Sequence, residues 1–203
     1  MPPADPSPKI LTARFEEAFL YAAKLHHGQT RKKTGRPYIG HLIGVAALVL
    51  QYDGDEEQAI AALLHDAPED QGGRPVLEEI RRRFGERVAH IVDGCTDTYD
   101  DPKPLWRARK EKYVEHVRHA DSDTVLVSAA DKLYNVREIL LDYRAQGETV
   151  WSRFTGGREG SLWYYRAIVD AFREAVGQQP IVRDLDREVV ELERLAAGSS
   201  TKT

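Results

Sequence analysis

The segment from Ala62 to Asp70 carries the residues best suited to chemistry in this chain. His65 and Asp66 lie side by side at the end of an apolar run, and Glu69 and Asp70 follow directly. A divalent metal ion bound beside an acid/base pair is chemistry that would use such a cluster. This hypothesis requires one more histidine and one more aspartate in similar surroundings elsewhere in the chain.

Two distant residues meet that requirement. His41 lies in a segment whose other face is apolar, where a lone histidine is more typical of a core residue than of a ligand. Asp131 ends the apolar run 125–131, and a buried carboxylate is unfavourable unless it is paired or metal-bound. Its alternative partners are Lys132 and Arg137, which flank it and are expected to be solvent-exposed.

Two histidines and two aspartates would form a mixed nitrogen and oxygen ligand set. The predicted metal ligands are His41, His65, Asp66 and Asp131. Because the set contains no thiolate, it favours Mn²⁺, with Fe²⁺, Zn²⁺ or Co²⁺ as alternatives, and it argues against a closed structural zinc site. The ion would lower the pKa of a water molecule and neutralise charge on a phosphate.

The elements that must position these residues are predicted to be helices. Apolar residues repeat with a helical period, and Gly or Pro separates the segments at short intervals. The expected helices cover 15–25, 37–49, 56–64, 75–84, 86–92, 105–119, 125–143, 161–176 and 182–196. Loops are expected at 97–104 and 149–160. The fold class is therefore all-α, with one domain of roughly eight to ten helices over residues 12–197, between disordered segments 1–11 and 198–203.

Capping residues and one proline refine the helix boundaries. Asp55 is expected to cap the helix that leads to His65, and Asp121 or one of the two residues after it caps the helix that carries Asp131. Pro68 lacks a backbone N–H and disfavours helical geometry at the preceding residue. The helix that leads to His65 should therefore end or kink at this proline.

Composition limits the class of partner. The 203-residue chain is 41% hydrophobic and 31% charged, as expected for a globular domain. Its net charge is −4, so no nucleic-acid polymer is expected as a partner. The longest apolar stretch, 42–50, is too short to span a bilayer, so no membrane partner is expected. Cys95 is the single cysteine, which excludes an intramolecular disulfide and, with no visible signal peptide, predicts a cytoplasmic location.

Several motifs together resemble a known family. The order of histidine, histidine-aspartate and aspartate in the ligand set is similar to the signature of the HD phosphohydrolase superfamily. The segments that narrow the resemblance are 27–32 (HGQTRK), 35–41 (GRPYIGH), 65–70 (HDAPED) and 130–137 (ADKLYNVR). In this order they resemble the motifs of the RelA/SpoT-type alarmone hydrolases, and most closely the stand-alone small hydrolases of animal SpoT-like type. The resemblance covers roughly residues 12–175.

The resemblance implies the all-α HD-domain fold and Mn²⁺-dependent removal of the 3′-pyrophosphate from ppGpp or pppGpp, which yields GDP or GTP and pyrophosphate. It implies the four metal ligands, and it makes Glu69 and Asp70 the acid/base carboxylates that position and deprotonate the attacking water. It also implies substrate contacts from Arg31, Lys32 and Asn135. Adjacent guanidinium and ammonium groups fit a polyphosphate, although this basic run could equally be a solvated loop. The chain is expected only to degrade its substrate, since its length leaves no room for a synthetase domain.

Three positions depart from the family pattern, and the first is Pro68, which stands between the metal ligands and the acid/base pair and could either aim or displace that pair. Ser128 stands where members usually carry a lysine, three residues before the last metal aspartate. Trp106 also stands where a lysine is expected, and it could either stack on a base or pack within the protein. Arg158, in the predicted Gly-rich loop 149–160, is expected to supply the missing charge to the substrate.

The shared site leaves the choice of substrate open, because the metal contacts only phosphate. A small nucleotide is the expected partner, and the alternatives to a guanosine alarmone are pppApp or NADPH at its 2′-phosphate. A non-catalytic nucleotide-binding regulator on the HD scaffold is a further alternative, which the intact acid/base pair argues against. Whether the chain forms a homo-oligomer is left open.

Overall fold

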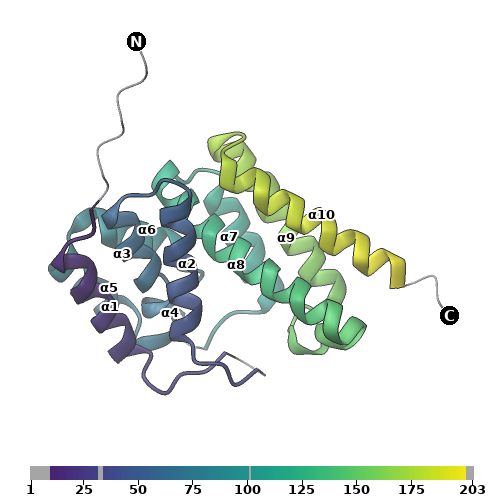
Figure 1. Cartoon of the computed structure of the whole chain (residues 1–203), viewed down its shortest axis with the longest axis horizontal. Coiled ribbons are helices and arrows are strands. Elements are labelled where there is room, and N and C mark those ends of the chain that lie inside the picture. Colours follow the sequence, from purple (N-terminus) through teal and green to yellow (C-terminus); the bar gives the residue numbers. More distant parts are fainter. Residues whose placement is uncertain (1–9, 32–33, 101, 200–203) are drawn as a thin grey trace, which may run out of the picture.

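The computed structural model describes residues 10–31, 34–100 and 102–199, and its regular elements are helices (Figure 1). The α-helices are α1 (Ala13–Leu25), α2 (Ile39–Gln51), α3 (Glu56–Leu64), α4 (Ala67–Gln71), α5 (Arg74–Phe84), α6 (Glu86–Cys95), α7 (Trp106–Val117), α8 (Ser122–Gln146), α9 (Gly157–Val176) and α10 (Pro180–Ser199). A 3-10 helix, η1, covers Gly147–Arg153. Within the described ranges, extended pairing is limited to one β-bridge between Thr30 and Pro37. The predicted all-α fold is therefore confirmed.

Local sequence explains where two helices of the site begin. The Asp55 carboxylate accepts a hydrogen bond from the Gln58 backbone N–H, and the Gln58 side chain accepts one from the Asp55 N–H, which forms a capping box for α3. The Asp121 carboxylate accepts a hydrogen bond from the Thr124 N–H at the start of α8. Both predicted caps are confirmed.

The helical path is interrupted between α3 and α4, as the proline predicted. Helix α3 ends at Leu64, and α4 begins at Ala67 with Pro68 in its first turn, where the missing N–H costs nothing. His65 is the C-cap of α3 and Asp66 is the N-cap of α4, so both lie in the junction. The Asp66 side chain makes no capping hydrogen bond and is available for other contacts.

Helix α8 occupies the centre of the fold. It packs against α2, α3 and α6, and also against α9, α10 and η1. Figure 1 shows α1–α6 gathered on one side of α8, with α9 and α10 on the other. Because α2 and α3 also pack on each other, the helices that carry the predicted ligands are in direct contact. Fully buried aliphatic residues such as Ile60, Leu63 and Leu133 fill the space among them.

The prediction of a loop over 149–160 is wrong. Residues up to Arg153 belong to η1, and α9 already begins at Gly157. A 3-10 helix repeats every three residues, so a search for the α-helical period does not detect it. Helix α10 extends through Ser199, into the segment predicted as a tail, whereas 1–9 and 200–203 lie outside the described residues. In the described part of the chain, no helix combines the length and apolar character needed to cross a membrane.

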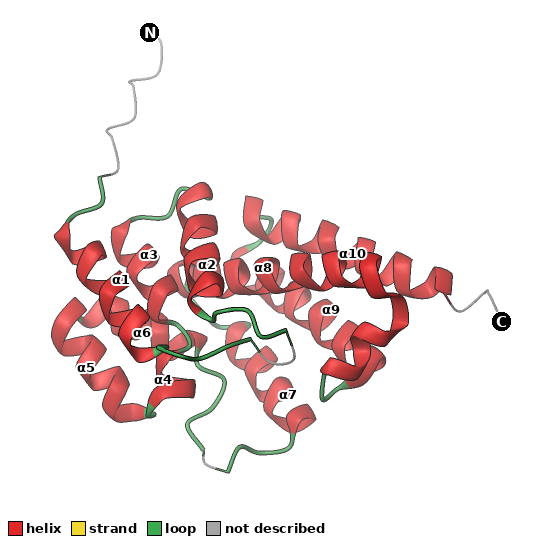
Figure 2. Cartoon of the chain, turned by 60° about the horizontal axis from the view of Figure 1, so that its bottom comes forward, coloured by secondary structure: helices red, strands yellow, loops and turns green. Residues whose placement is uncertain are grey.

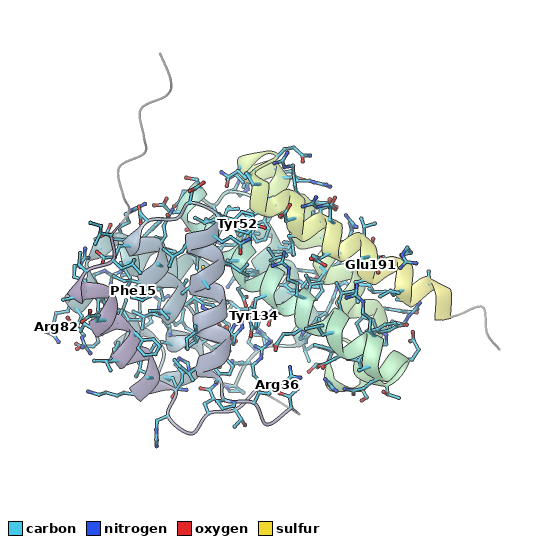
Figure 3. All side chains as sticks on the ribbon, viewed as in Figure 1. Phe15, Arg36, Tyr52, Arg82, Tyr134 and Glu191 are labelled. Atoms are coloured by element: carbon cyan, nitrogen blue, oxygen red, sulfur yellow. The ribbon has the colours of Figure 1, made fainter. Side chains whose placement is uncertain are left out.

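Gly44 lies at a close contact between α2 and α8. A Cβ atom at this position would lie 2.0 Å from Cε2 of Tyr134, a separation that forces the ring to move. Figure 3 shows Tyr134 at the contact between α2 and α8. The Tyr134 ring also meets the His41 ring edge-on, with centres 5.1 Å apart. The glycine therefore permits a packing arrangement that supports a predicted metal ligand.

The substitution Gly44→Ala is expected to lower the free energy of unfolding by about 1–3 kcal/mol, the usual cost of overpacking. Gly40→Ala is the matched control, since it lies in the same helix and nothing lies within 4 Å of its added Cβ. The control should be neutral or stabilising by up to about 1 kcal/mol, because alanine favours the helix. Urea unfolding of both variants measures the difference, and equal stability would contradict the close contact with Tyr134.

Candidate metal centre and active site

Four side chains from three parts of the chain meet at one point. They are His41 in the first turn of α2, His65 and Asp66 at the α3–α4 junction, and Asp131 within α8. Nε2 of His41 lies 3.2 Å from Oδ1 of Asp131 and 3.5 Å from Oδ2 of Asp66. Nε2 of His65 lies 3.1 Å from the same Asp66 oxygen and 3.7 Å from the same Asp131 oxygen. The structure therefore brings all four predicted ligands together.

The arrangement fits a divalent metal ion. Two ligand atoms about 2.1 Å from one ion lie about 3 Å apart when they subtend a right angle at it, close to the separations found here. Nδ1 of His65 donates a hydrogen bond to the Ala62 carbonyl at 2.8 Å, which leaves the lone pair on Nε2. That Nε2 is buried and has no hydrogen-bond partner among the described residues. A metal ion would give this orphaned atom its partner.

The charges of the cluster also favour a bound cation. Burial alone would raise the carboxyl pKa values, but His65 lowers the pKa of Asp66, and Lys132 lowers the pKa of Asp131, to well below the usual range. Burial disfavours the His65 cation, yet the two carboxylates raise its pKa to about 10. Two ionised carboxylates thus lie beside Nε2 of His65 and strongly favour positive charge at that position. A metal ion can replace the proton on this nitrogen.

Neighbouring side chains orient the two aspartates. The Tyr38 hydroxyl donates to Oδ2 of Asp66 at 2.5 Å. The Asn135 amide donates to Oδ1 of Asp131 at 2.5 Å, and Nζ of Lys132 lies 2.5 Å from its Oδ2. Such supporting contacts fix the rotamers of metal-binding groups. The expectation that Lys132 is exposed is wrong, because it turns inward and its side chain is 12% exposed.

The predicted acid/base carboxylates lie on α4, one turn beyond the junction. Glu69 and Asp70 line a pocket of about 490 Å³ together with Tyr99 and Lys103. Figure 2 shows this face of the molecule, where the α1–α2 and α6–α7 connections approach α4. Nζ of Lys103 lies 2.7 Å from Oε1 of Glu69, and the Gln29 amide donates to Oδ2 of Asp70 at 2.8 Å. Neither Lys103 nor Gln29 was identified from the sequence, since neither follows a helical spacing relative to α4.

The structure describes three of the four predicted substrate residues, and they lie in two different places. Arg31 donates to Oδ1 of Asn135 at 2.5 Å and to Glu138 at 2.8 Å, and Asn135 in turn donates to the predicted metal ligand Asp131. Lys32 lies outside the described residues. Arg158 lies in the first turn of α9, donates to the Ala196 carbonyl at 2.9 Å and lies 3.6 Å from Glu148. Both of these contacts are with elements C-terminal to α8.

Of the departures from the family pattern, Ser128 is buried and Trp106 is half-buried against neighbouring aromatic rings. The Ser128 hydroxyl is buried and lies 2.7 Å from the Tyr113 hydroxyl. Nζ of Lys132 lies 5.2 Å from the centre of the Tyr113 ring. Lys132 therefore places a positive charge close to Ser128, the position where family members usually carry a lysine. Trp106 meets Trp163 and Tyr164 edge-on, each with ring centres 6.4 Å apart. Of the two interpretations of Trp106, the structure supports packing within the protein.

The sequence of residues 18–162 matches the HD domain family, and this chain belongs to that family. Guanosine-3′,5′-bis(diphosphate) 3′-pyrophosphohydrolase MESH1 of Danio rerio is 42% identical over 132 residues, which cover 63% of this chain and 70% of the relative. The MESH1 of Homo sapiens is 39% identical over 130 residues, with the same coverage of 63% and 70%. A solved structure of a metazoan ortholog of SpoT that hydrolyses ppGpp matches with a TM-score of 0.73 at 27% identity, over 94% of this chain and 97% of the other.

Proposed function

We propose that this chain is a metal-dependent hydrolase that removes the 3′-pyrophosphate from ppGpp or pppGpp. One observation carries the proposal: four ligand atoms meet at one point, and two carboxylates stand one helical turn further on. Relatives with 39–42% identity are named for this reaction. The reaction adds water across the bond between the 3′ oxygen and phosphorus, so it yields GDP or GTP and pyrophosphate.

We assign Mn²⁺ to the site, with Fe²⁺, Zn²⁺ or Co²⁺ as substitutes, because two imidazoles and two carboxylates form a mixed donor set. When bound, the ion would neutralise phosphate charge and make water more acidic. The roles of His41, His65, Asp66 and Asp131 are to hold it in place. A single buried cysteine, Cys95, is compatible with the predicted cytoplasmic location.

The chain's own residues account for proton transfer and substrate charge. Glu69 and Asp70 line the pocket, where a carboxylate can accept the proton of the attacking water. Arg31 and Asn135 are proposed to face the nucleotide, and Lys103 adds an ammonium group on the pocket side. The roles of Lys32 and Arg158 as substrate contacts remain predictions.

Purified protein supplied with Mn²⁺ should release pyrophosphate from ppGpp, and this measurement tests the proposal directly. Assays of ppGpp, pppGpp, pppApp and NADPH in parallel would compare the candidate substrates, with product identity established by chromatography. Release of orthophosphate in place of pyrophosphate would contradict the assigned bond cleavage. Absence of turnover on both guanosine nucleotides, with the metal bound, would overturn the substrate assignment.

A further inference from the structure

Three polar residues stand beside the site but have no part in the function proposed so far: His26, Gln29 and Tyr38. They come from the end of α1 and the connection to α2. The Tyr38 hydroxyl donates to Oδ2 of Asp66 at 2.5 Å, and its ring meets the His41 ring edge-on, with centres 5.5 Å apart. One tyrosine therefore contacts two of the four metal ligands.

The backbone holds Gln29 and Tyr38 opposite each other. The Tyr38 N–H donates to the Gln29 carbonyl at 2.9 Å, and the Arg31 N–H donates to the Arg36 carbonyl at 2.8 Å. The single β-bridge of the described residues lies between these two bonds. The Gln29 and Tyr38 side chains are therefore attached to one short stretch of paired backbone.

The direction of each hydrogen bond around Gln29 follows from its carboxylate partner. A carboxylate only accepts, so Gln29 presents Nε2 to Oδ2 of Asp70, 2.8 Å away. Its Oε1 then faces Nδ1 of His26 at 2.8 Å, and that nitrogen must carry a proton in order to donate. The side-chain amide of Gln71 donates to the same Oε1. Both ends of the Gln29 amide are thus engaged, and its orientation is determined.

His26 contacts both Gln29 and Tyr38. It is 3% exposed, and its ring stacks on the Tyr38 ring with centres 5.2 Å apart and planes 16° apart. Burial lowers the pKa of His26, so the ring is neutral near pH 7. Its Nε2 is buried with no partner among the described residues, so a proton there would be an unpaired buried N–H. The single proton therefore resides on Nδ1, facing Gln29.

We propose that His26, Gln29 and Tyr38 form a positioning unit with two separable effects on the site. Tyr38 orients the metal ligand Asp66, Gln29 orients the acid/base carboxylate Asp70, and the His26 ring holds the two in one frame. The unit thus holds the proposed metal ligand Asp66 and the acid/base carboxylate Asp70 in a fixed relation to each other. This inference rests on the proposed function, and it names the residues that align the metal ligands with the acid/base carboxylates.

The variant Tyr38→Phe tests the first effect, because it removes the hydroxyl and keeps the ring. The dissociation constant for Mn²⁺, measured by titration calorimetry without substrate, is expected to rise about 10–100-fold. At saturating Mn²⁺, kcat for pyrophosphate release should return to within about threefold of wild type, since all four proposed ligands remain and a higher Mn²⁺ concentration compensates for weaker binding.

The variant Gln29→Leu tests the second effect. The dissociation constant for Mn²⁺ should stay within about twofold of wild type, because the Gln29 side chain hydrogen-bonds to Asp70, His26 and Gln71 and to none of the four ligands. The kcat value at saturating Mn²⁺ should fall by about 10²-fold, since a displacement of about 1 Å at a reacting group has that consequence.

His26 variants separate its ring from its proton. His26→Phe keeps the stacking and loses the N–H, so it should resemble Gln29→Leu, with lower kcat and unchanged Mn²⁺ affinity. His26→Ala loses both contacts and should impair both quantities. His27→Ala is the matched control, since His27 is the exposed neighbour and should leave both unchanged. Thermal unfolding of each variant identifies any loss of the fold, and His26→Phe serves where His26→Ala does not fold.

Each outcome bears on the inference. A loss of kcat with unchanged affinity in Tyr38→Phe, or equal losses of both quantities in every variant, would overturn it. Wild-type levels of both quantities in Gln29→Leu would overturn it as well. Because Mn²⁺ binding is measured without substrate, failure of the proposed function is distinguishable: the affinity pattern would persist while ppGpp is not hydrolysed.

Discussion

Asp66→Ala is expected to abolish pyrophosphate release from ppGpp. It should also raise the dissociation constant for Mn²⁺ by more than about 100-fold, which is the upper end of the effect of removing a residue that only supports a ligand. The reason is geometric, since Oδ2 of Asp66 lies 3.5 Å from Nε2 of His41 and 3.1 Å from Nε2 of His65. Without it, one of the two anionic ligands is lost. Titration calorimetry with Mn²⁺ and an assay of pyrophosphate release measure the two effects.

Asp66 is a cleaner choice than Asp131 for this experiment. Asp131 also neutralises the inward-facing Lys132, so its removal would leave a buried cation and cost about 3–5 kcal/mol of stability. Asp170→Ala is a suitable control, because Asp170 is half-exposed on α9 and its ion pair with Arg173, at 3.7 Å, lies at the surface. Turnover that survives Asp66→Ala would rule out the metal centre described here.

Glu69→Gln should lower kcat by about 10²–10⁴-fold, the range for loss of a general acid or base. The amide keeps the shape of the side chain but is a far weaker proton acceptor. Metal affinity should be retained, because Glu69 is not one of the four side chains that meet at the metal site. Steady-state pyrophosphate release at saturating Mn²⁺ gives kcat, and calorimetry gives the affinity.

The control for this variant is Glu78→Gln, since Glu78 lies on α5 with its side chain 65% exposed and should not affect turnover. A kcat within about threefold of wild type in Glu69→Gln would transfer the role of proton acceptor to Asp70, and Asp70→Asn would then be expected to show the loss. Wild-type kcat in both Glu69→Gln and Asp70→Asn would contradict the assignment of these two carboxylates as the acid/base pair.

Short-range features of this protein are determined by the sequence alone. The caps at Asp55 and Asp121, the break at Pro68 and the all-α class follow from interactions between residues a few positions apart. Such interactions act in any chain with those neighbours. The four proposed ligands can also be named from the sequence, because Asp131 is a carboxylate in an apolar helical run and the order of the histidines and aspartates resembles the HD signature.

Contacts between distant segments are decided only by the tertiary structure. Tyr38 supports Asp66 from 28 positions away, and Lys103 reaches Glu69 from 34 positions away, although each of these residues is ordinary in its own segment. Trp106 could have faced a nucleotide or the core, and packing against α9 decided between them. The pattern of residue types indicates which groups need a partner. Which partner each one finds depends on how the helices pack, because a side chain's surroundings come mainly from elements remote in the chain.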